Sequence, residues 1–252
     1  MLFRNKIVVV TGSASGIGKS LSKRFLDEGA IVISADIHFS DKKIANNHYE
    51  KNCDVSSEEQ INKLIRSVLD KFETIDIFFS NAGILSLGDE NTSNEEWEKN
   101  WNIHLMSHVF ICRLIIPQFK KQCSGHLVIT SSAAGLLTHL DSLSYSVTKQ
   151  ASIALAEWIA ISNKEFGINV SVLCPQAVRT NMTEGREKDV AAIDGILEPE
   201  EVANEIVLGI TEKKFLILPH KQVYNYMNNK VKNYDKWISG MQKLKKKITD
   251  LK

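Results

Sequence analysis

Short apolar segments alternate along the chain with longer stretches in which apolar residues recur every three or four positions. The apolar segments lie at residues 6–10, 31–35, 75–79, 126–130, 169–173 and 215–218, and a further short strand is expected at residues 49–53. Helical spacing is clearest over residues 17–29, 93–122, 144–166 and 199–211. Continuous apolar runs are typical of parallel strands that are buried on both faces. The pattern therefore predicts an α/β fold: a doubly wound parallel sheet of about seven strands with helices on both faces.

Two helix starts carry a recognisable capping signal. Ser56 is followed three residues later by Glu59, and Ser93 is followed by Glu96. This spacing is that of a capping box, in which the serine hydroxyl accepts a hydrogen bond from the backbone amide of the glutamate, and the glutamate carboxylate accepts one from the backbone amide of the serine. We expect helices to begin at both serines.

The end of the chain differs in charge from the rest. Residues 221–252 contain nine lysines and two aspartates, although the net charge of the whole chain is only +1. Apolar residues recur there at helical spacing from Tyr226 to Ile248. We expect a basic amphipathic helical extension, residues 221–252, after a catalytic domain of residues 1–220. Its apolar stripe would pack on its own core or on a neighbouring subunit; the alternative is a helix lying on an anionic membrane.

Composition argues against several other classes of protein. With 43% hydrophobic and 24% charged residues, the chain resembles a soluble globular protein, and its charge gives no argument for a nucleic-acid partner. No run approaches the ~18 apolar residues of a membrane span, and the first run is too short for a signal peptide. The four cysteines lack the spacings of disulfide or zinc frameworks, so we expect reduced thiols, a cytoplasmic location and no metal site.

A glycine-rich turn joins the first predicted strand to the first predicted helix. Gly12, Gly16 and Gly18 would let the backbone turn sharply and approach a ligand. Amides at the start of the following helix would then face a pyrophosphate. A glycine turn without a ligand is the alternative, but the strand–turn–helix context favours a dinucleotide site.

The second strand ends at Asp36, and this residue bears on the choice of cofactor. A carboxylate at that point can accept hydrogen bonds from both adenosine ribose hydroxyls, and it repels a 2′-phosphate. Ser15 occupies a place in the glycine loop where a cation could have received that phosphate. The sequence therefore favours NAD, with NADP as the less favoured cofactor.

Two further strand ends carry candidate cofactor contacts. Asp54 could meet the adenine amino group, or it could serve only as a carboxylate at a helix start. The fourth strand stops at residues 80–83, Ser-Asn-Ala-Gly. Small residues there suit close packing against a cofactor, because ligands of open parallel sheets bind beyond the carboxyl ends of the strands.

Tyr145 and Lys149 lie one turn apart on a predicted helix and can therefore contact one ligand. A neighbouring cation lowers the pKa of a phenol, which makes it a possible general acid or base near neutral pH. Ser132 precedes the tyrosine by thirteen residues, in a loop from which its hydroxyl could reach the phenol. Such a pair also occurs by chance in many helices, so its meaning depends on the other motifs.

Six motifs occur in the order and at the spacings of the short-chain dehydrogenase/reductase family, which the chain resembles over about residues 5–218. They are Thr11-Gly12-x-x-x-Gly16-Ile17-Gly18, Asp54-Val55, Asn81-Ala82-Gly83, Ser132, Tyr145-x-x-x-Lys149 and Pro175-x-x-Val178-x-Thr180. The resemblance implies a single-domain Rossmann fold of the ~250-residue type. It also implies an NAD(P)-dependent oxidoreductase that transfers a hydride between NAD(H) and a secondary alcohol or ketone.

The resemblance further implies a role for each motif. Tyr145 would exchange the proton with the substrate oxygen as general acid/base, and Ser132 would stabilise that oxygen. Lys149 would hold the nicotinamide ribose and lower the pKa of the tyrosine. Besides Tyr145 and Lys149, the cofactor would contact Gly12, Ser15, Gly16, Ile17, Gly18, Asp36, Asp54, Val55, Asn81, Ala82, Gly83, Val178 and Thr180.

The chain departs from the family pattern at two positions. His104 stands where most members have an asparagine that extends a proton relay; it could be a titrating relay member or a packed histidine. It also has metal-ligand spacing with His108, although no third ligand is in view. Gln176 stands where a glycine usually follows the proline, and it could narrow the pocket, offer an amide to the substrate or point into solvent.

The resemblance places the substrate against Leu85, the segment 136–143 and a lid at about 181–198. The leucines there, with His139 as a polar contact, suggest an apolar pocket for a medium-sized alcohol or ketone, although they could equally be lid packing. A homodimer or homotetramer through the two long helices is also implied, with Trp101 and His108 near a symmetry axis. The alternatives are a catalytically weak NAD-binding regulatory protein on the same fold, or an NADP-preferring carbonyl reductase.

Overall fold

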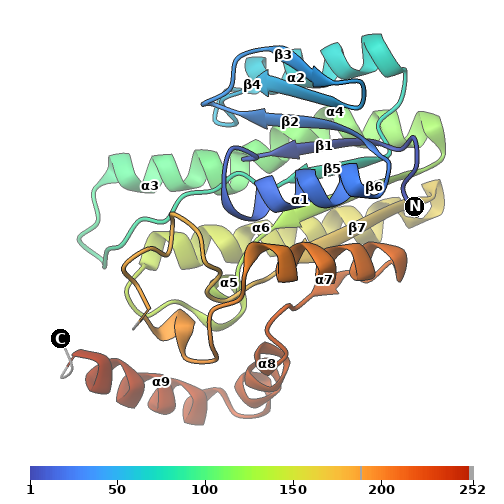
Figure 1. The fold of residues 1–252 in the computed structure, drawn as a ribbon. Coiled ribbons are helices and arrows are strands. Elements are labelled where there is room, and N and C mark those ends of the chain that lie inside the picture. The colour runs from blue at the N-terminus through green and yellow to red at the C-terminus, as the bar shows by residue number, and fades with distance from the viewer. Residues whose placement is uncertain (188, 250–252) are drawn as a thin grey trace.

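An eight-stranded sheet forms the centre of the molecule (Figure 1) in a computed structural model that describes residues 1–187 and 189–249. Residue 188 of the predicted lid and residues 250–252 of the predicted extension lie outside the described residues. The strand order is β3-β4-β2-β1-β5-β6-β7-β8. The strands are β1 (Ile7–Thr11), β2 (Ile31–Asp36), β3 (Lys42–Ala45), β4 (His48–Asn52), β5 (Ile77–Ser80), β6 (Gly125–Thr130), β7 (Ile168–Leu173) and β8 (Leu216–Ile217).

All strand pairs are parallel except β3 with β4. The predicted doubly wound parallel sheet is therefore confirmed, with one strand more than expected. The sequence pattern missed β3 because its residues are exposed and two of them are lysines. Lys42 forms an ion pair with Glu50 of the neighbouring strand at 2.9 Å. Lysines on an edge strand also oppose pairing with strands of other molecules.

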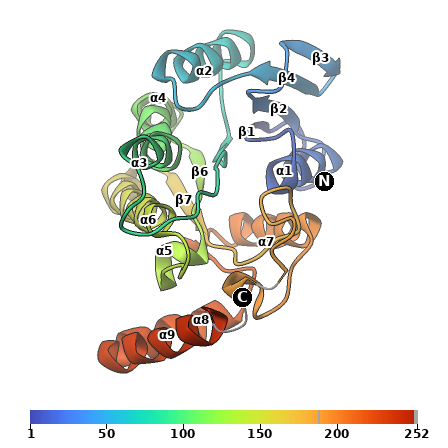
Figure 2. The ribbon, with the colours of Figure 1, turned by 90° about the vertical axis from the view of Figure 1, so that its left-hand side faces the viewer.

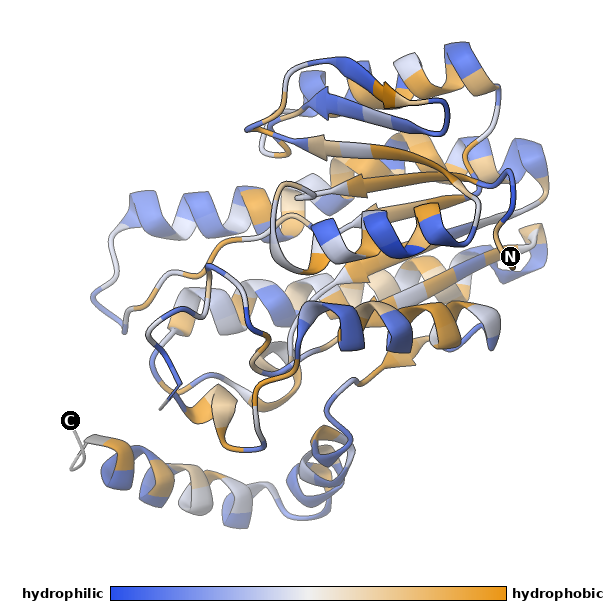
Figure 3. Ribbon diagram, in the orientation of Figure 1, coloured by the Kyte–Doolittle hydropathy of each residue, from blue (hydrophilic) through white to orange (hydrophobic). Residues whose placement is uncertain are grey.

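Helices cover both faces of the sheet (Figure 2). One face carries α1 (Gly16–Asp27) and α7 (Pro199–Thr211), and the other carries α2 (Glu58–Phe72), α4 (Ser107–Gln122) and α6 (Leu143–Asn163). Side chains alternate along each strand. In β1, Val8 and Val10 therefore pack under α1 and α7, whereas Ile7 and Val9 pack under the other three helices. The central strands are accordingly apolar along almost their whole length (Figure 3).

The remaining helical segments lie outside this list. They are α3 (Asn94–Trp101), the π-helical turn η1 (Asn102–Met106), α5 (Ala133–Leu137), the 3₁₀ turns η2 (Lys164–Phe166) and η3 (Val190–Ala192), α8 (Gln222–Lys232) and α9 (Tyr234–Thr249). Among the described residues, none of the helices combines the length and the apolar character needed to cross a membrane.

The two predicted capping boxes are only partly present. The N-cap of α2 is Ser57, whose hydroxyl accepts a hydrogen bond from the amide of Gln60. The predicted cap at Ser56 is therefore wrong by one residue, since that hydroxyl instead donates to Asp54. Ser93 does cap α3, but the side chain of Glu96 does not complete the box, because it accepts a hydrogen bond from Ser86 on the preceding loop.

The C-terminal extension forms two helices because the backbone is extended at Asn233. Val223 of α8 is fully buried against Ala133 and Leu137 near α5, so this helix packs on the chain's own core. α9 runs away from that contact beneath the lid (Figure 1). The outer sides of the two helices expose the apolar residues Tyr224, Val231, Tyr234 and Ile238.

Candidate active site

The carboxyl ends of the parallel strands meet at one edge of the sheet, and a cavity of about 1070 Å³ opens there. This volume lies just above the range for small-molecule sites, about 300–1,000 Å³. The structure brings every predicted catalytic and cofactor-binding residue to its lining: Gly12, Ser15, Gly16, Ile17, Gly18, Asp36, Asp54, Val55, Asn81, Ala82, Gly83, Ser132, Tyr145, Lys149, Val178 and Thr180.

The glycine turn between β1 and α1 forms one wall of the cavity. Gly12 has a φ of +68° and Gly16 a φ of +52°, in the left-handed region that favours glycine. A Cβ atom on Gly12 would also lie 2.7 Å from the Cα atom of Ala82. The turn therefore brings bare backbone close to the loop after β5, and it presents the start of α1, whose N-cap is Ser15, to the cavity.

Asp36 ends β2 and contacts the glycine turn directly. One carboxylate oxygen accepts a hydrogen bond from the amide of Ala14 at 3.0 Å, and the other accepts one from the amide of His38 at 3.1 Å. These bonds hold the carboxylate at the rim of the cavity. The glycine turn and the loop after β2 contribute no lysine or arginine to the lining, as far as the described residues extend.

Asp54 and Asn81 both order the backbone around them. Asp54 accepts hydrogen bonds from the amide and hydroxyl of Ser56 at 2.9 and 2.7 Å, which is the helix-start role, and it also lines the cavity. The side-chain nitrogen of Asn81 donates to the carbonyl of Thr11 at 2.9 Å, and its side-chain oxygen accepts from the hydroxyl of Thr130 at 3.0 Å. Asn81 thus ties the ends of β1 and β6 to the loop after β5.

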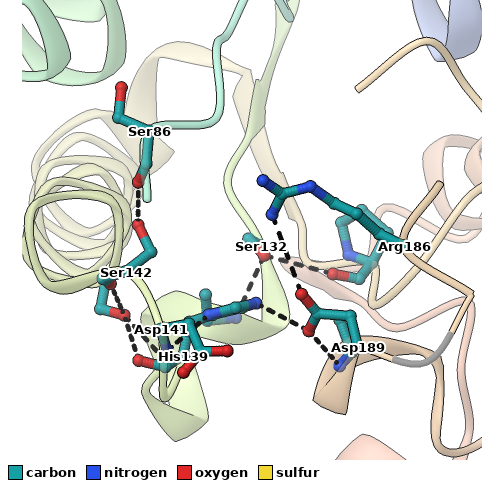
Figure 4. A network of polar contacts seen from close by, with 11 residues as sticks. Ser86, Ser132, His139, Asp141, Ser142, Arg186 and Asp189 are labelled. Carbon is teal, nitrogen blue, oxygen red and sulfur yellow. Dashed lines mark hydrogen bonds and ion pairs between the residues drawn. The ribbon is translucent and has the colours of Figure 1, made fainter. Parts of the chain in front are cut away.

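Ser132, Tyr145 and Lys149 lie at the centre of the lining. Ser132 is the N-cap of α5; its hydroxyl accepts a hydrogen bond from the amide of Ala134 at 3.1 Å and donates to the carbonyl of Pro175 at 3.4 Å (Figure 4). Tyr145 and Lys149 extend from α6, and both are almost fully buried. The ammonium of Lys149 donates to the carbonyl of Thr130 at 2.9 Å and lies 5.6 Å from the centre of the Tyr145 ring.

Burial dominates the protonation equilibria of this pair. It raises the pKa of Tyr145, although a hydrogen bond with Ser132 acts in the opposite direction. It also lowers the pKa of Lys149 to about 8. The structure therefore does not show the lowered phenol pKa that the sequence predicts. Burial destabilises the phenolate by more than the hydrogen bond with Ser132 stabilises it.

His104 lies inside η1, where the hydrogen-bond pattern of the long helix changes. Its Nε2 accepts a hydrogen bond from the amide of Ile84 at 3.0 Å, and its Nδ1 lies 3.0 Å from the hydroxyl of Thr148. That hydroxyl donates to the carbonyl of Ser144 at 2.9 Å, so Nδ1 carries the imidazole proton and donates it. Burial, followed by the charge of Lys149, holds the pKa of His104 well below its usual value. The structure thus shows a packed neutral histidine, which argues against a titrating relay member.

The second departure from the family pattern, Gln176, lines the cavity and does not point into solvent. Its backbone amide donates to Nδ1 of His220 at 3.2 Å. Its side-chain oxygen is buried and has no hydrogen-bond partner within the described part of the chain. A buried amide oxygen without a partner is costly, so this atom is suited to accept a hydrogen bond from a bound molecule.

The expected substrate residues are divided among several environments. Leu85, Leu137 and His139 line the cavity. Leu136 instead packs against the cluster under α8, and Leu143 is exposed on the outer side of α6. The prediction of a leucine-lined pocket is therefore only partly right, because the short helix α5 turns its residues in different directions.

His139 connects the segment after Ser132 to the lid (Figure 4). Its Nδ1 accepts a hydrogen bond from the amide of Asp141 at 3.2 Å, so the proton is on Nε2, which lies 3.1 Å from a carboxylate oxygen of Asp189. The same oxygen of Asp189 accepts a hydrogen bond from the amide of Ala191 at 3.0 Å. Burial raises the pKa of Asp189, but these hydrogen bonds outweigh it and leave the pKa lowered. Both nitrogens of His139 are thus engaged within the protein.

His108, expected near a symmetry axis, lies in the interior. It is 1% exposed and hydrogen-bonds Ser80, and burial lowers its pKa to about 3. It therefore lies too deep to contact a second subunit, whereas Trp101 is 41% exposed. Within the described residues, no three His, Cys, Asp or Glu side chains are grouped as metal ligands.

Sequence reasoning missed the contribution of the C-terminal helices to the cavity. Residues of both helices and of the junction between them line it: Tyr226, Asn229, Lys232, Asn233, Lys236, Trp237, Gly240, Met241 and Leu244. One signal was available. Trp237, Met241 and Leu244 follow one another at intervals of four and three residues, and this places them on one side of the helix, although the same spacing fits a helix packed on a core.

Comparison with known proteins agrees with the geometry of the site. The model of the family described as short chain dehydrogenase matches residues 6–191. A meso-2,3-butanediol dehydrogenase of Serratia marcescens is 31% identical over 217 residues, which cover 81% of this chain and 86% of that protein. Epidermal retinol dehydrogenase 2 of Mus musculus is 26% identical over 87% of this chain and 75% of that protein.

The fold has close counterparts among solved structures. A short-chain dehydrogenase/reductase of Burkholderia phymatum, solved in complex with NAD, superimposes with a TM-score of 0.83 at 22% identity, covering 93% of this chain and 96% of that one. The matched segment, residues 6–191, contains the glycine turn and the serine, tyrosine and lysine of the cavity. This chain therefore belongs to the short-chain dehydrogenase family of oxidoreductases.

Proposed function

We propose that the protein transfers a hydride between NAD(H) and a secondary alcohol or ketone, with Ser132, Tyr145 and Lys149 as its catalytic residues. One observation carries the proposal: these three side chains, the glycine turn and Asp36 line a single cavity. A dinucleotide bound at the glycine turn and an alcohol bound at Tyr145 would therefore lie next to each other in one cavity.

Each catalytic residue has a distinct task in this proposal. When bound, the nicotinamide supplies or accepts the hydride. The hydroxyl of Tyr145 gives a proton to the substrate oxygen during reduction and takes one during oxidation. Ser132 donates a hydrogen bond to the same oxygen, and α5 fixes its hydroxyl. Lys149 holds the ribose hydroxyls, and its positive charge opposes the effect of burial on Tyr145.

The geometry around Asp36 supports NAD as the cofactor. Its carboxylate lies at the rim of the cavity, and the glycine turn beside it offers Ser15 in place of a cation. The 2′-phosphate of NADP would be repelled by the carboxylate of Asp36, and the glycine turn offers no cation to neutralise it. We assign the pyrophosphate to the first-turn amides of α1 and the carboxamide end of the cofactor to Val178, Thr180 and the unpartnered oxygen of Gln176.

A panel of alcohols and ketones with NAD(H) and with NADP(H), followed at the nicotinamide absorbance, tests the proposal. Turnover with NAD(H) that is lost on removing the Tyr145 hydroxyl is the expected result. Tight NADH binding without turnover across chemically diverse compounds would instead favour a regulatory protein on the same fold. Preference for NADPH would refute the role given to Asp36.

The lid contact of His139 with Asp189 leads to a prediction about substrate affinity. Asp189→Ala removes the contact that joins the lid to the segment after Ser132. We expect KM for the alcohol to rise about fivefold, because a partly buried charge-assisted hydrogen bond of about 1 kcal/mol no longer closes the lid. The Kd of NADH should change less than twofold. Glu187→Ala is the matched control, since it removes an exposed carboxylate of the same lid. Equal KM values in the two variants would contradict a closing role.

The neutral state of His104 leads to a prediction about pH dependence. His104→Asn should lower kcat about tenfold, because the bonds to Ile84 and Thr148 that position the tyrosine helix are lost. Since burial lowers the pKa of His104 well below its usual value, no ionisation near ~6.5 should disappear from the pH–rate profile. Thr148→Val is the control, because it removes one of the same bonds and no ionisable group. If the wild-type pH–rate profile shows an ionisation near ~6.5 that His104→Asn abolishes and Thr148→Val does not, His104 is a titrating member of a proton relay after all.

The exposed face of α6 supports the homodimer or homotetramer that the family resemblance implies. Trp158 and Ile161 on that helix are 64% and 81% exposed, and large exposed apolar residues close together mark a surface for association. We propose that this face meets its copy in a second subunit.

A further inference from the structure

The C-terminal helices form the wall of the cavity on the side of the lid. Trp237, Met241 and Leu244 of α9 line it, and they are partly buried, whereas most of the helix is exposed. These residues lie along one side of α9, so together they offer an apolar strip on the order of 10 Å long. An apolar strip that faces a cavity is suited to the hydrocarbon part of a bound molecule.

This wall is fixed to the rest of the site by three contacts of α8. The hydroxyl of Tyr226 donates to Asp194 of the lid at 2.9 Å. The ammonium of Lys230 donates to the carbonyl of Leu136 in α5 at 2.6 Å. Val223 is fully buried beside that helix. Because α8 is joined both to the lid and to the helix that carries Ser132 at its start, α9 follows directly from a fixed element of the site.

Two cations lie at the junction of these helices. Lys232 and Lys236 both line the cavity, and across the described ranges neither ammonium makes a hydrogen bond or an ion pair with the protein. The carboxylates among the described lining residues are Asp36, the last residue of β2, and Asp54, which follows β4. Asp235, the neighbour of Lys236 in sequence, is outside the lining. The lid side of the cavity therefore carries positive charge that a ligand can neutralise.

We propose that the substrate is an amphiphilic anion. Its hydroxyl or carbonyl group lies at Tyr145, its hydrocarbon body lies against Trp237 and Met241, and its anionic end group, a carboxylate or a phosphate, lies at Lys232 and Lys236. The inference rests on the proposed function, since it assigns a substrate class to the same cavity. It adds the two lysines as residues that determine specificity.

Paired substrates test the charge requirement directly. Hydroxydecanoates with the hydroxyl at different carbons are compared with their methyl esters, with NAD and at low ionic strength. For the isomers that are oxidised, we expect kcat/KM of the acid to exceed that of the ester about fivefold, and added salt should reduce the difference because the lysines are exposed. An ester that is oxidised as well as its acid would overturn the inference.

Lysine variants locate the effect. The double variant Lys232→Gln, Lys236→Gln should remove the preference for the acid, by lowering kcat/KM of the acid about fivefold to the value of the ester. Lys246→Gln is the matched control, because Lys246 is an exposed lysine of α9 outside the cavity lining. A preference that persists in the double variant, or that falls equally in the control, would show that the general charge of the helix and not these two side chains recognises the acid.

Binding without turnover separates this inference from the proposed function. Decanoate, decyl phosphate and decan-1-ol are titrated calorimetrically into the NADH-loaded protein and its double variant. Tighter binding of the anions, lost in the variant, supports the inference even if no compound is oxidised, in which case only the proposed function fails. The two anions distinguish a carboxylate from a phosphate end group. Oxidation of neutral alcohols with equal binding of all three compounds would support the function and refute the inference.

Discussion

Replacing Tyr145 by phenylalanine is expected to lower kcat about a thousandfold, within the range of about 10²–10⁴ for loss of a positioned acid or base. Phenylalanine keeps the ring, which is buried beside His104 and Lys149, and removes only the hydroxyl. The Kd of NADH should therefore change less than about twofold, since ring packing against the cofactor side of the cavity is kept. Steady-state turnover and fluorescence titration with NADH measure the two quantities.

Tyr226→Phe is the matched control for this experiment. Tyr226 lines the same cavity, but its hydroxyl donates to Asp194 of the lid and not toward the catalytic serine. We expect this variant to retain kcat within about threefold, because the hydrogen bond that it loses, from Tyr226 to Asp194 of the lid, does not act on the reacting atoms. Loss of activity of similar size in both variants would indicate that a general change of the cavity, and not proton transfer, explains the effect at Tyr145.

Asp36→Asn is expected to shift the preference for NAD over NADP about 100-fold toward NADP, equivalent to about 2.7 kcal/mol. The charge that repels a 2′-phosphate disappears, while the asparagine oxygen still accepts a hydrogen bond from the amide of Ala14 or His38. The glycine turn should therefore keep its shape. The ratio of kcat/KM values for the two cofactors is the measurement.

Asp54→Asn is the control for charge alone. It removes another carboxylate from the cavity lining, but one that lies beyond β4 and caps the turn at Ser56. Asp54→Asn should change kcat/KM with NAD and kcat/KM with NADP by similar factors, so the preference between the two cofactors should stay the same. An equal shift in cofactor preference in both variants would mean that total negative charge selects the cofactor, and an unchanged preference in Asp36→Asn would refute the assignment of the ribose to Asp36.

The parts of the fold that sequence reasoning predicted share one property: their signal is local. Most of the central strands are largely apolar, and the helical spacing of residues 199–211 predicts α7 with the bounds that the structure gives it. The same is true of the site. Its residues follow strand ends, and a parallel sheet brings strand ends to one edge without further information.

The parts that were missed depend on contacts distant in sequence. All residues of β3 are exposed, so no buried apolar run reveals this strand, and it exists because β4 offers it hydrogen bonds. The phenol pKa of Tyr145 depends on how deeply α6 is buried, which motif spacing does not report. The wall formed by α9 depends on the break at Asn233 and on the contact of Tyr226 with the lid. An apolar stripe in sequence does not reveal whether a core, a partner or a cavity lies opposite it.

The position of that wall in the chain has a consequence during synthesis. The glycine turn, β1 and β2 leave the ribosome first, whereas α8 and α9 follow every strand of the sheet. Because a single domain generally folds as a unit, the cavity can be completed only after these last helices have emerged. A nascent chain would thus lack one wall of its cavity until the end of its synthesis.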